Sequence, residues 1–286
     1  MSSAASRPVR SASARTILSR TSGYIAEAGF THSLTPARNC TFGCTYCYVP
    51  TLRVQGGLKP EDWQRWGQFT TFKSNAADLL RRDLRKQQRI YCSPLVDPYQ
   101  PAEEGERMMP RILDALIASP PRVFALQTRG PLILRDLNLL RELAHRTTLR
   151  VSFSITTNLE TIRRWYEPHC APITERLAVI GALRHAGIET YATLAPLLPC
   201  DPEELALRAI EASGHDLIGD ALHVRNAKPH GATTRDAAFR VSAAHQHAQW
   251  LDPAFQCEII GRIQAAANAL GHRFVTGPSG FARLAV

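Results

Sequence analysis

Three cysteines stand close together in the segment 39–48, which reads Asn39-Cys40-Thr41-Phe42-Gly43-Cys44-Thr45-Tyr46-Cys47-Tyr48. The spacing is Cys-x3-Cys-x2-Cys, and the aromatic Tyr46 precedes the last cysteine. Three thiolates are one ligand short of a closed tetrahedral zinc site or a four-cysteine iron–sulfur cluster. A metal held here therefore keeps one coordination position for a substrate-like ligand, which indicates chemistry rather than scaffolding.

The rest of the chain is typical of a soluble globular protein. Its 286 residues fit one large α/β domain or two small ones, and they can bury a sizeable core. No apolar run long enough to span a membrane occurs, and the N-terminus lacks an apolar segment with a cleavage site. Seven cysteines, an odd number, do not indicate a disulfide framework. The sequence predicts a cytoplasmic protein in a reducing compartment, with no membrane contact.

The charge balance permits a nucleic-acid partner without demanding one. Lys and Arg number 34 against 25 acids, a net charge of +9 that would attract polyanions. Only four of these cations are Lys, so the Arg content partly reflects a coding bias. Residues 1–22 are rich in Ser, Ala and Arg and contain no acid. We expect a disordered basic leader there, with an organellar transit peptide as the alternative.

Beyond the leader, short apolar runs alternate with helical patterns, as in successive βα units of a parallel sheet. Predicted strands cover 32–36, 89–94, 122–128, 149–156, 188–194 and 220–225. Predicted helices cover 75–88, 107–118, 131–144, 173–186 and 202–212, and a final helix covers 253–270. Six βα units make an open barrel whose functional residues sit at the carboxyl ends of the strands. We therefore expect a barrel core over 23–225 and an extension over 226–286 whose helix packs on the core.

The cysteine triplet, with Tyr46 before its third member and in the loop after a first strand, resembles the radical S-adenosylmethionine superfamily. The resemblance implies that Cys40, Cys44 and Cys47 bind three irons of a [4Fe–4S] cluster, and that S-adenosylmethionine chelates the fourth. It implies reductive cleavage of that cosubstrate to a 5′-deoxyadenosyl radical, which abstracts hydrogen from a substrate. It also implies an open partial (βα)6 barrel of the TIM type and places Tyr46 beside the adenine. The alternative is a zinc knuckle or redox cluster with a distant fourth ligand.

Further segments resemble one branch of that superfamily, the spore photoproduct lyase-like proteins. This resemblance covers roughly residues 24–200 and implies a lyase-like enzyme of DNA repair. Residues 226–250 match no motif. The segments are Asp97-Pro98-Tyr99-Gln100-Pro101-Ala102-Glu103, Gly130-Pro131-Leu132-Ile133-Leu134-Arg135-Asp136, Val151-Ser152-Phe153-Ser154-Ile155-Thr156-Thr157, Glu167-Pro168 and Glu175-Arg176.

Polar residues at the predicted strand ends supply partners for such a ligand, whose polar groups must be re-paired when they leave water. Ser93 and Asp97 follow the second strand, and Arg129 follows the third. Three hydroxyls alternate along the fourth strand and share one face, namely Ser152, Ser154 and Thr156. By the resemblance, Ser93 or Asp97 approaches the methionine end, Arg129 the carboxylate, and Ser154 the ligand as well. Ordinary strand-end hydrogen bonding is the alternative, and Asp97 before Pro98 also forms turns.

The other cysteines leave two interpretations open. Cys92 lies where the lyase places a hydrogen-donating cysteine, although its spacing to the following aspartate differs, and a free cysteine on a core strand is usually a small buried hydrophobe. Cys170 and Cys200 follow the fourth and fifth strands and could face the same mouth, but their separations match no ligand pattern. The aromatics Trp63, Trp66, Phe69 and Phe72 suit either base stacking or a packed satellite core.

Three functional hypotheses follow. The first is a radical S-adenosylmethionine enzyme acting on a nucleic-acid lesion or modified nucleotide, with an electron donor such as flavodoxin or ferredoxin. The second is the same chemistry on a peptide or a small metabolite, because one fold hosts unrelated reactions. The third is a non-enzymatic iron–sulfur or zinc protein that binds nucleic acid and senses redox state.

Overall fold

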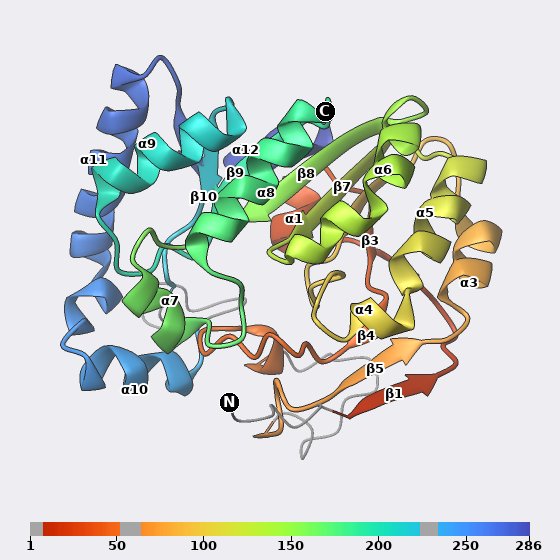
Figure 1. Ribbon diagram of the computed structural model, residues 1–286, viewed down its shortest axis with the longest axis horizontal. Helices are drawn as coiled ribbons and strands as arrows, with labels where there is room; N and C mark the ends of the chain where they lie inside the picture. Colours follow the sequence, from red (N-terminus) through yellow and green to blue (C-terminus); the bar gives the residue numbers. More distant parts are fainter. Residues whose placement is uncertain (1–7, 52–63, 224–233) are drawn as a thin grey trace.

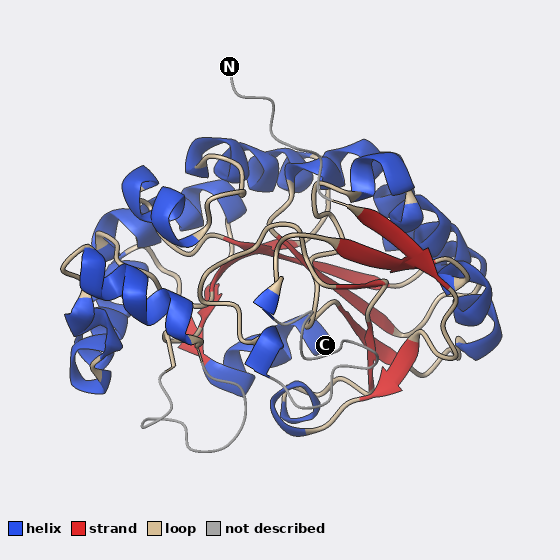
Figure 2. Ribbon diagram, turned by 90° about the horizontal axis from the view of Figure 1, so that it is seen from below, coloured by secondary structure: helices blue, strands red, loops and turns tan. Residues whose placement is uncertain are grey.

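An eight-stranded sheet forms the centre of the computed structural model, which describes residues 8–51, 64–223 and 234–286. The strand order is β11-β10-β9-β8-β7-β6-β3-β2, and all neighbours are parallel except the antiparallel pair β2 and β3. The sheet curves with most helices on its outside, as the predicted open barrel requires (Figure 2). The strands are β2 (Leu18–Arg20), β3 (His32–Leu34), β6 (Arg89–Cys92), β7 (Val123–Thr128), β8 (Thr148–Ser154), β9 (Thr190–Leu194), β10 (Leu217–Gly219) and β11 (Phe274–Thr276).

The six predicted helices are present, and each of them buries apolar residues. In α5 (Met108–Ala118), for example, Met109, Ile112 and Leu116 recur at helical spacing and are fully buried. The segment 131–144 begins as a 3-10 helix, η2 (Pro131–Asp136), and continues as α6 (Leu137–Ala144). The others are α3 (Ala76–Asp83), α8 (Ile173–His185), α9 (Pro202–Ser213) and α11 (Pro253–Ala269). No helix in the described ranges combines the length and apolarity that crossing a membrane requires.

Several shorter elements were not predicted. Helices α1 (Gly23–Glu27) and α12 (Gly277–Phe281) pack with Tyr91, Ala125 and Tyr191 in a second, smaller apolar cluster. Because side chains alternate along a strand, Ile90 and Cys92 point to the opposite face and join the main core. The remaining elements are α4 (Glu103–Glu106), α7 (Glu160–Tyr166), α10 (Asp236–Ala244), η1 (Val49–Thr51), η3 (Ala248–Leu251) and η4 (Ala282–Ala285).

The prediction of a disordered leader is wrong for residues 8–22. Strand β1 (Val9–Ala12) pairs in parallel with β5 (Thr70–Lys73), which pairs with β4 (Ala37–Arg38) in a separate three-stranded sheet. Strand β2 follows and joins the main sheet at its edge. Most of β1 is exposed, so backbone pairing holds it rather than an apolar stripe, and composition gives no sign of that. Residues 1–7 lie outside the described ranges.

The predicted extension also contributes to the sheet. Strand β11 pairs in parallel with β10, and α11 packs against α9, the helix between β9 and β10 (Figure 1). The sixth strand was expected at 220–225 but occupies 217–219. Gly219 permits this register, because a Cβ there would lie 2.5 Å from the Phe274 ring and 2.7 Å from the Leu194 carbonyl oxygen.

Candidate active site

The cysteine loop lies between β4 and η1, close to the carboxyl end of β3. Its three cysteines are free thiols; Cys40 and Cys44 are buried and Cys47 is half-buried. Asn39 begins the loop with φ +62°, and its Oδ1 accepts hydrogen bonds from the amides of Cys40 (2.8 Å) and Gly67 (3.0 Å). Asparagine tolerates this left-handed backbone conformation because its short side-chain amide can form local hydrogen bonds. The three predicted ligands thus lie on one loop whose start is held by the side chain of Asn39.

Gln100, which sequence reasoning did not single out, holds the loop from the other side. It is fully buried, and its Oε1 accepts from the Thr41 amide (2.8 Å) and from the Thr41 hydroxyl (3.1 Å). Its Nε2 has no hydrogen-bond partner among the described residues, and neither does the buried Oγ of Ser154 on β8. Buried polar atoms without a partner are costly, so their presence points to a ligand that pairs with them.

A buried carboxylate, Glu167, forms ion pairs with two arginines beside the loop. Its oxygens accept from Tyr46, from Arg129, from Thr156 (2.9 Å) and from Arg176 (2.5 Å). Glu167 and Arg176 are both fully buried. Burial alone would raise the pKa of Glu167, but the guanidinium groups of Arg176 and Arg129 lower it to about 2. One carboxylate therefore positions two arginines and the predicted adenine-side tyrosine.

Arg129 connects this cluster to the cysteines. Its Nη1 lies 3.7 Å from Cys44 Sγ and also donates to Tyr46. Its backbone amide donates to Asp97 (2.8 Å), which also accepts from the hydroxyl of Thr128 (2.6 Å) and the amide of Tyr99 (2.9 Å). Burial raises the pKa of Asp97 despite these donors. Asp97 is therefore the predicted turn-former and also joins the ends of β6 and β7; a contact with the ligand remains a prediction.

The three hydroxyls predicted on one strand face have different partners. Ser152 bonds the hydroxyl of Thr193 at 2.6 Å, and Thr156 donates to Glu167. Ser154 alone keeps an unpaired buried oxygen. Ser93 is also buried, and its hydroxyl lies 3.5 Å from that of Thr35. Of these hydroxyls, Ser154 is the one that lacks a hydrogen-bond partner among the described residues.

Cys92 has the surroundings of an apolar side chain. It ends β6, is fully buried, and its neighbours across the sheet are Leu34 and Leu126. Burial raises the pKa of its thiol well above the usual range. These contacts favour the buried-hydrophobe interpretation, and the hydrogen-donor role remains an untested prediction.

Cys170 lies beside Cys44, with 3.9 Å between their sulfurs. The ligand atoms of Cys44, Cys170 and Glu167 all lie within 4.8 Å of one another, the spacing of a single-ion site. We do not assign an ion there, because both oxygens of Glu167 accept from arginines and Arg129 brings a positive charge to Cys44. Cys170 is nevertheless the one additional cysteine that the fold brings to the triplet; its sequence spacing gave no sign of this.

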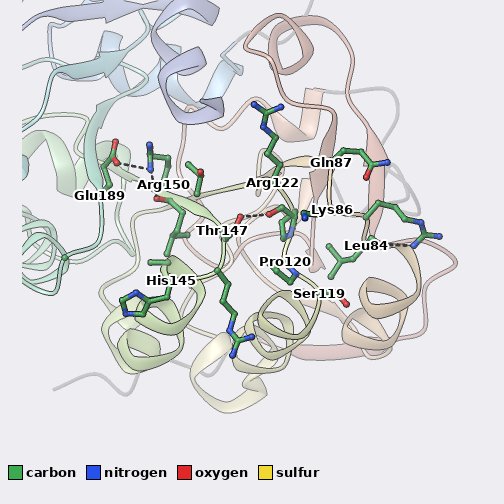
Figure 3. A pocket seen from close by; sticks show the side chains of 17 residues that line it. Leu84, Lys86, Gln87, Ser119, Pro120, Arg122, His145, Thr147, Arg150 and Glu189 are labelled. Carbon is green, nitrogen blue, oxygen red and sulfur yellow. Dashed lines mark hydrogen bonds and ion pairs between the residues drawn. The ribbon is translucent and has the colours of Figure 1, made fainter.

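Two hollows in the described surface lie at opposite ends of the sheet. A cavity of about 310 Å³ opens beside the loop, between Phe42, Gly130 and Cys170. A groove of about 1320 Å³ lies at the amino ends of β6 to β9, the opposite end of the sheet, and five cations line it with one acid, Glu189 (Figure 3). The cations are Arg85, Lys86, Arg122, Arg146 and Arg150. The small cavity belongs to the cysteine site, and the groove does not.

Gly130 follows Arg129 where two backbones touch, and we expect Gly130→Ala to destabilise the protein. An added Cβ would lie 2.2 Å from the Tyr99 carbonyl oxygen, so one backbone must move. The expected loss in the free energy of unfolding is about 1–3 kcal/mol, measured by urea denaturation. Gly181→Ala in α8 is the control: its Cβ would meet nothing within 4 Å, and we expect a gain of about 0.5–1 kcal/mol. Equal stability of the two variants would contradict the contact.

Residues 34–210 match the family model of the radical SAM superfamily. The chain belongs to this superfamily, whose members are enzymes.

The curated relatives carry no known function. Uncharacterized proteins of Mycobacterium tuberculosis and Mycobacterium bovis are each 32% identical to the chain over 182 residues, which is 61% of this chain and 52% of theirs. An uncharacterized protein of Methanocaldococcus jannaschii is 25% identical over 160 residues, 56% of this chain and 58% of its own. The chain thus spans about half the length of the curated relatives it matches.

Solved structures of spore photoproduct lyase share the fold. A mutant of that enzyme superimposes with a TM-score of 0.60 at 15% identity, covering 94% of this chain and 81% of the lyase. Another, with bound AdoMet and dinucleoside spore photoproduct, gives 0.54 at 14% identity over 86% and 80%. The predicted resemblance to the lyase branch is therefore confirmed at the level of the fold.

The residues present fit the superfamily's cofactors. Three free thiols on one loop match a cluster with an open iron, and the unpaired Nε2 of Gln100 and Oγ of Ser154 match a polar ligand beside it. Every side-chain hydrogen bond of Arg129 to another described residue uses Nη1, which leaves Nε and Nη2 for a carboxylate.

Proposed function

We propose that this protein reductively cleaves S-adenosylmethionine at a [4Fe–4S] cluster held by Cys40, Cys44 and Cys47. When bound and reduced, these cofactors supply a 5′-deoxyadenosyl radical that takes a hydrogen atom from a substrate. The observation that carries the proposal is the set of three free thiols on one loop, next to buried polar atoms that lack partners. A flavodoxin or ferredoxin would deliver the electron.

The protein's own residues would bind and orient the cosubstrate. Arg129, held in place by Glu167, would donate to its carboxylate, and the side chains of Gln100 and Ser154 would pair with its remaining polar groups. Tyr46, anchored by its hydroxyl to Glu167, would present its ring to the adenine. Because Glu167 fixes both Arg129 and Tyr46, the two ends of the ligand would be positioned by one buried group.

The test is anaerobic incubation of the reconstituted protein with S-adenosylmethionine and dithionite. We expect 5′-deoxyadenosine and methionine, formed only with reductant. A stable cluster that yields neither product would favour the redox-sensor alternative, and one zinc without sulfide would favour a zinc knuckle.

For the substrate we propose a nucleic-acid lesion or modified nucleotide. Spore photoproduct lyase, which shares the fold, has been solved with dinucleoside spore photoproduct. The net charge of +9 and the cation-lined groove also favour a polyanion. A small metabolite would need neither the groove nor the charge.

The affinity for single-stranded DNA should fall as the salt concentration rises, because the cations of the groove would contact phosphates. We expect the triple variant Arg85→Gln, Lys86→Gln and Arg122→Gln to reduce the slope of log affinity against log salt by about 2, since each lost phosphate contact removes about 0.7. The measurement is fluorescence anisotropy across a salt series. A control variant removes the same charge elsewhere, from arginines that pair with acids: Arg208→Gln, Arg262→Gln and Arg273→Gln. An equal change in both variants would mean that net charge, and not the groove, sets the affinity.

A further inference from the structure

We propose that Arg235 is a positioning residue that clamps the cysteine loop and raises the reduction potential of its cluster. This inference rests on the proposed function. It concerns a part of the chain that lies outside the 34–210 match to the superfamily and in which the sequence shows no motif. Arg235 lies between strands β10 and β11, in the connection that follows the family match.

Arg235 reaches the loop between two of the predicted cluster ligands. Its Nε donates to the Thr45 carbonyl (2.8 Å) and its Nη2 to the Cys44 carbonyl (3.0 Å). Paired donors of a planar guanidinium fix the orientation of what they bind. Two successive carbonyls, just before Cys47, are therefore held in one direction by a residue 191 positions away from Cys44.

The helix that carries Arg235 is docked on the element next to the loop. Arg235 directly precedes α10, and α10 packs against α7 (Figure 1). The hydroxyls of Ser242 and Tyr166 bond at 2.6 Å, and the His245 ring stacks on Trp165 at 3.6 Å between centroids.

The same α7 residue binds the opposite side of the loop. The carbonyl of Tyr166 accepts from the Thr45 amide (2.9 Å) and from its hydroxyl (3.3 Å). Thr45 is thus hydrogen-bonded through its amide to Tyr166 of α7 and through its carbonyl to Arg235. Since Ser242 of α10 is hydrogen-bonded to Tyr166 of α7, the two helices hold Thr45 together.

The charge of Arg235 faces the loop rather than an acid. Within the described ranges no carboxylate forms an ion pair with Arg235, and the side chain is half-buried. A positive charge in such a partly dry position stabilises the reduced cluster, which carries one more negative charge than the oxidised cluster. The reduction accepts one electron from the external donor and needs no further reactant. Arg235 therefore makes that electron easier to accept.

The test is an anaerobic redox titration of the reconstituted protein, followed by the electron paramagnetic resonance signal of the reduced cluster. At the wild-type midpoint, we expect Arg235→Gln to lower the ratio of reduced to oxidised cluster by about tenfold, a shift of about 59 mV for one electron. Arg235→Lys keeps the charge but loses the paired donors, so its midpoint should lie between those of the wild type and Arg235→Gln. Arg240→Gln removes a charge from an exposed position of the same helix and should leave the midpoint unchanged.

The outcomes separate this inference from the proposed function. A wild-type midpoint in Arg235→Gln, or an equal shift in Arg240→Gln, would overturn the clamp. If Arg235→Gln takes up no cluster, Ser242→Ala decides: it keeps the charge but loosens α10, so a lowered midpoint supports the clamp and an unchanged one refutes it. A wild-type protein that binds no [4Fe–4S] cluster would refute the proposed function itself.

Discussion

Cys44→Ala is expected to abolish both cluster assembly and 5′-deoxyadenosine formation. Cys44 is buried in the middle of the loop, next to Arg129 and Cys170, and the variant removes one of the three predicted thiolate ligands. We expect the rate to fall at least about a thousandfold, because the protein's side chains offer no other route to this radical chemistry. Iron and sulfide analysis and product chromatography measure the two effects.

The control for this variant is Cys257→Ala. Cys257 is exposed on α11, and its removal should change neither iron content nor rate. Because Cys170 lies beside Cys44, a second comparison is between Cys44→Ala and Cys170→Ala. If the cluster survived Cys44→Ala but not Cys170→Ala, the ligand would be Cys170, and the assignment of the triplet would be wrong.

Glu167→Ala is expected to cost about 3–5 kcal/mol of unfolding free energy, the usual result of breaking a buried ion pair on one side. Arg176 would keep a fully buried charge without its carboxylate, and Tyr46 and Thr156 would lose their acceptor. Urea denaturation of the apoprotein measures this without any cofactor. Glu203→Ala breaks an exposed pair with Arg262 and should cost at most about 1 kcal/mol. Similar losses in the two variants would contradict the central place of Glu167.

The same carboxylate should make stability depend on pH. The pKa of folded Glu167 is lowered to about 2, below its value of about 4.3 in an unfolded chain. Its contribution is therefore complete above the unfolded pKa and is lost as the pH falls toward 2. Glu167→Gln should make the free energy of unfolding less dependent on pH between these values. An unchanged loss of stability in acid would mean that other groups cause it.

The sequence predicted elements whose periodicity is local. Helix α5 shows its apolar stripe along 11 residues, and α9 is preceded by Asp201, whose side chain accepts from the Glu204 amide as an N-cap should. Strand β11 has only 3 residues, too few for any alternation to appear. Strand β1 is held mainly by its backbone, which composition does not record. Short and exposed strands are defined by their partners, and those lie elsewhere in the chain.

The candidate site divides in the same way. The triplet was visible because its members are neighbours in sequence, and the polar strand ends followed from the parallel topology. The role of Glu167 was hidden, although Glu167-Pro168 was part of the resemblance, because Tyr46, Arg129 and Arg176 reach it from separate elements. Gln100 and Arg235 were hidden for the same reason.

The most direct test of the central claim is the electron paramagnetic resonance spectrum of the reduced protein with and without S-adenosylmethionine. The claim is that three cysteines leave one iron open to this cosubstrate. It predicts a [4Fe–4S] signal that changes shape when S-adenosylmethionine is added, in wild type but not in Cys44→Ala. A cluster signal that S-adenosylmethionine leaves unchanged, or no cluster signal at all, would contradict it.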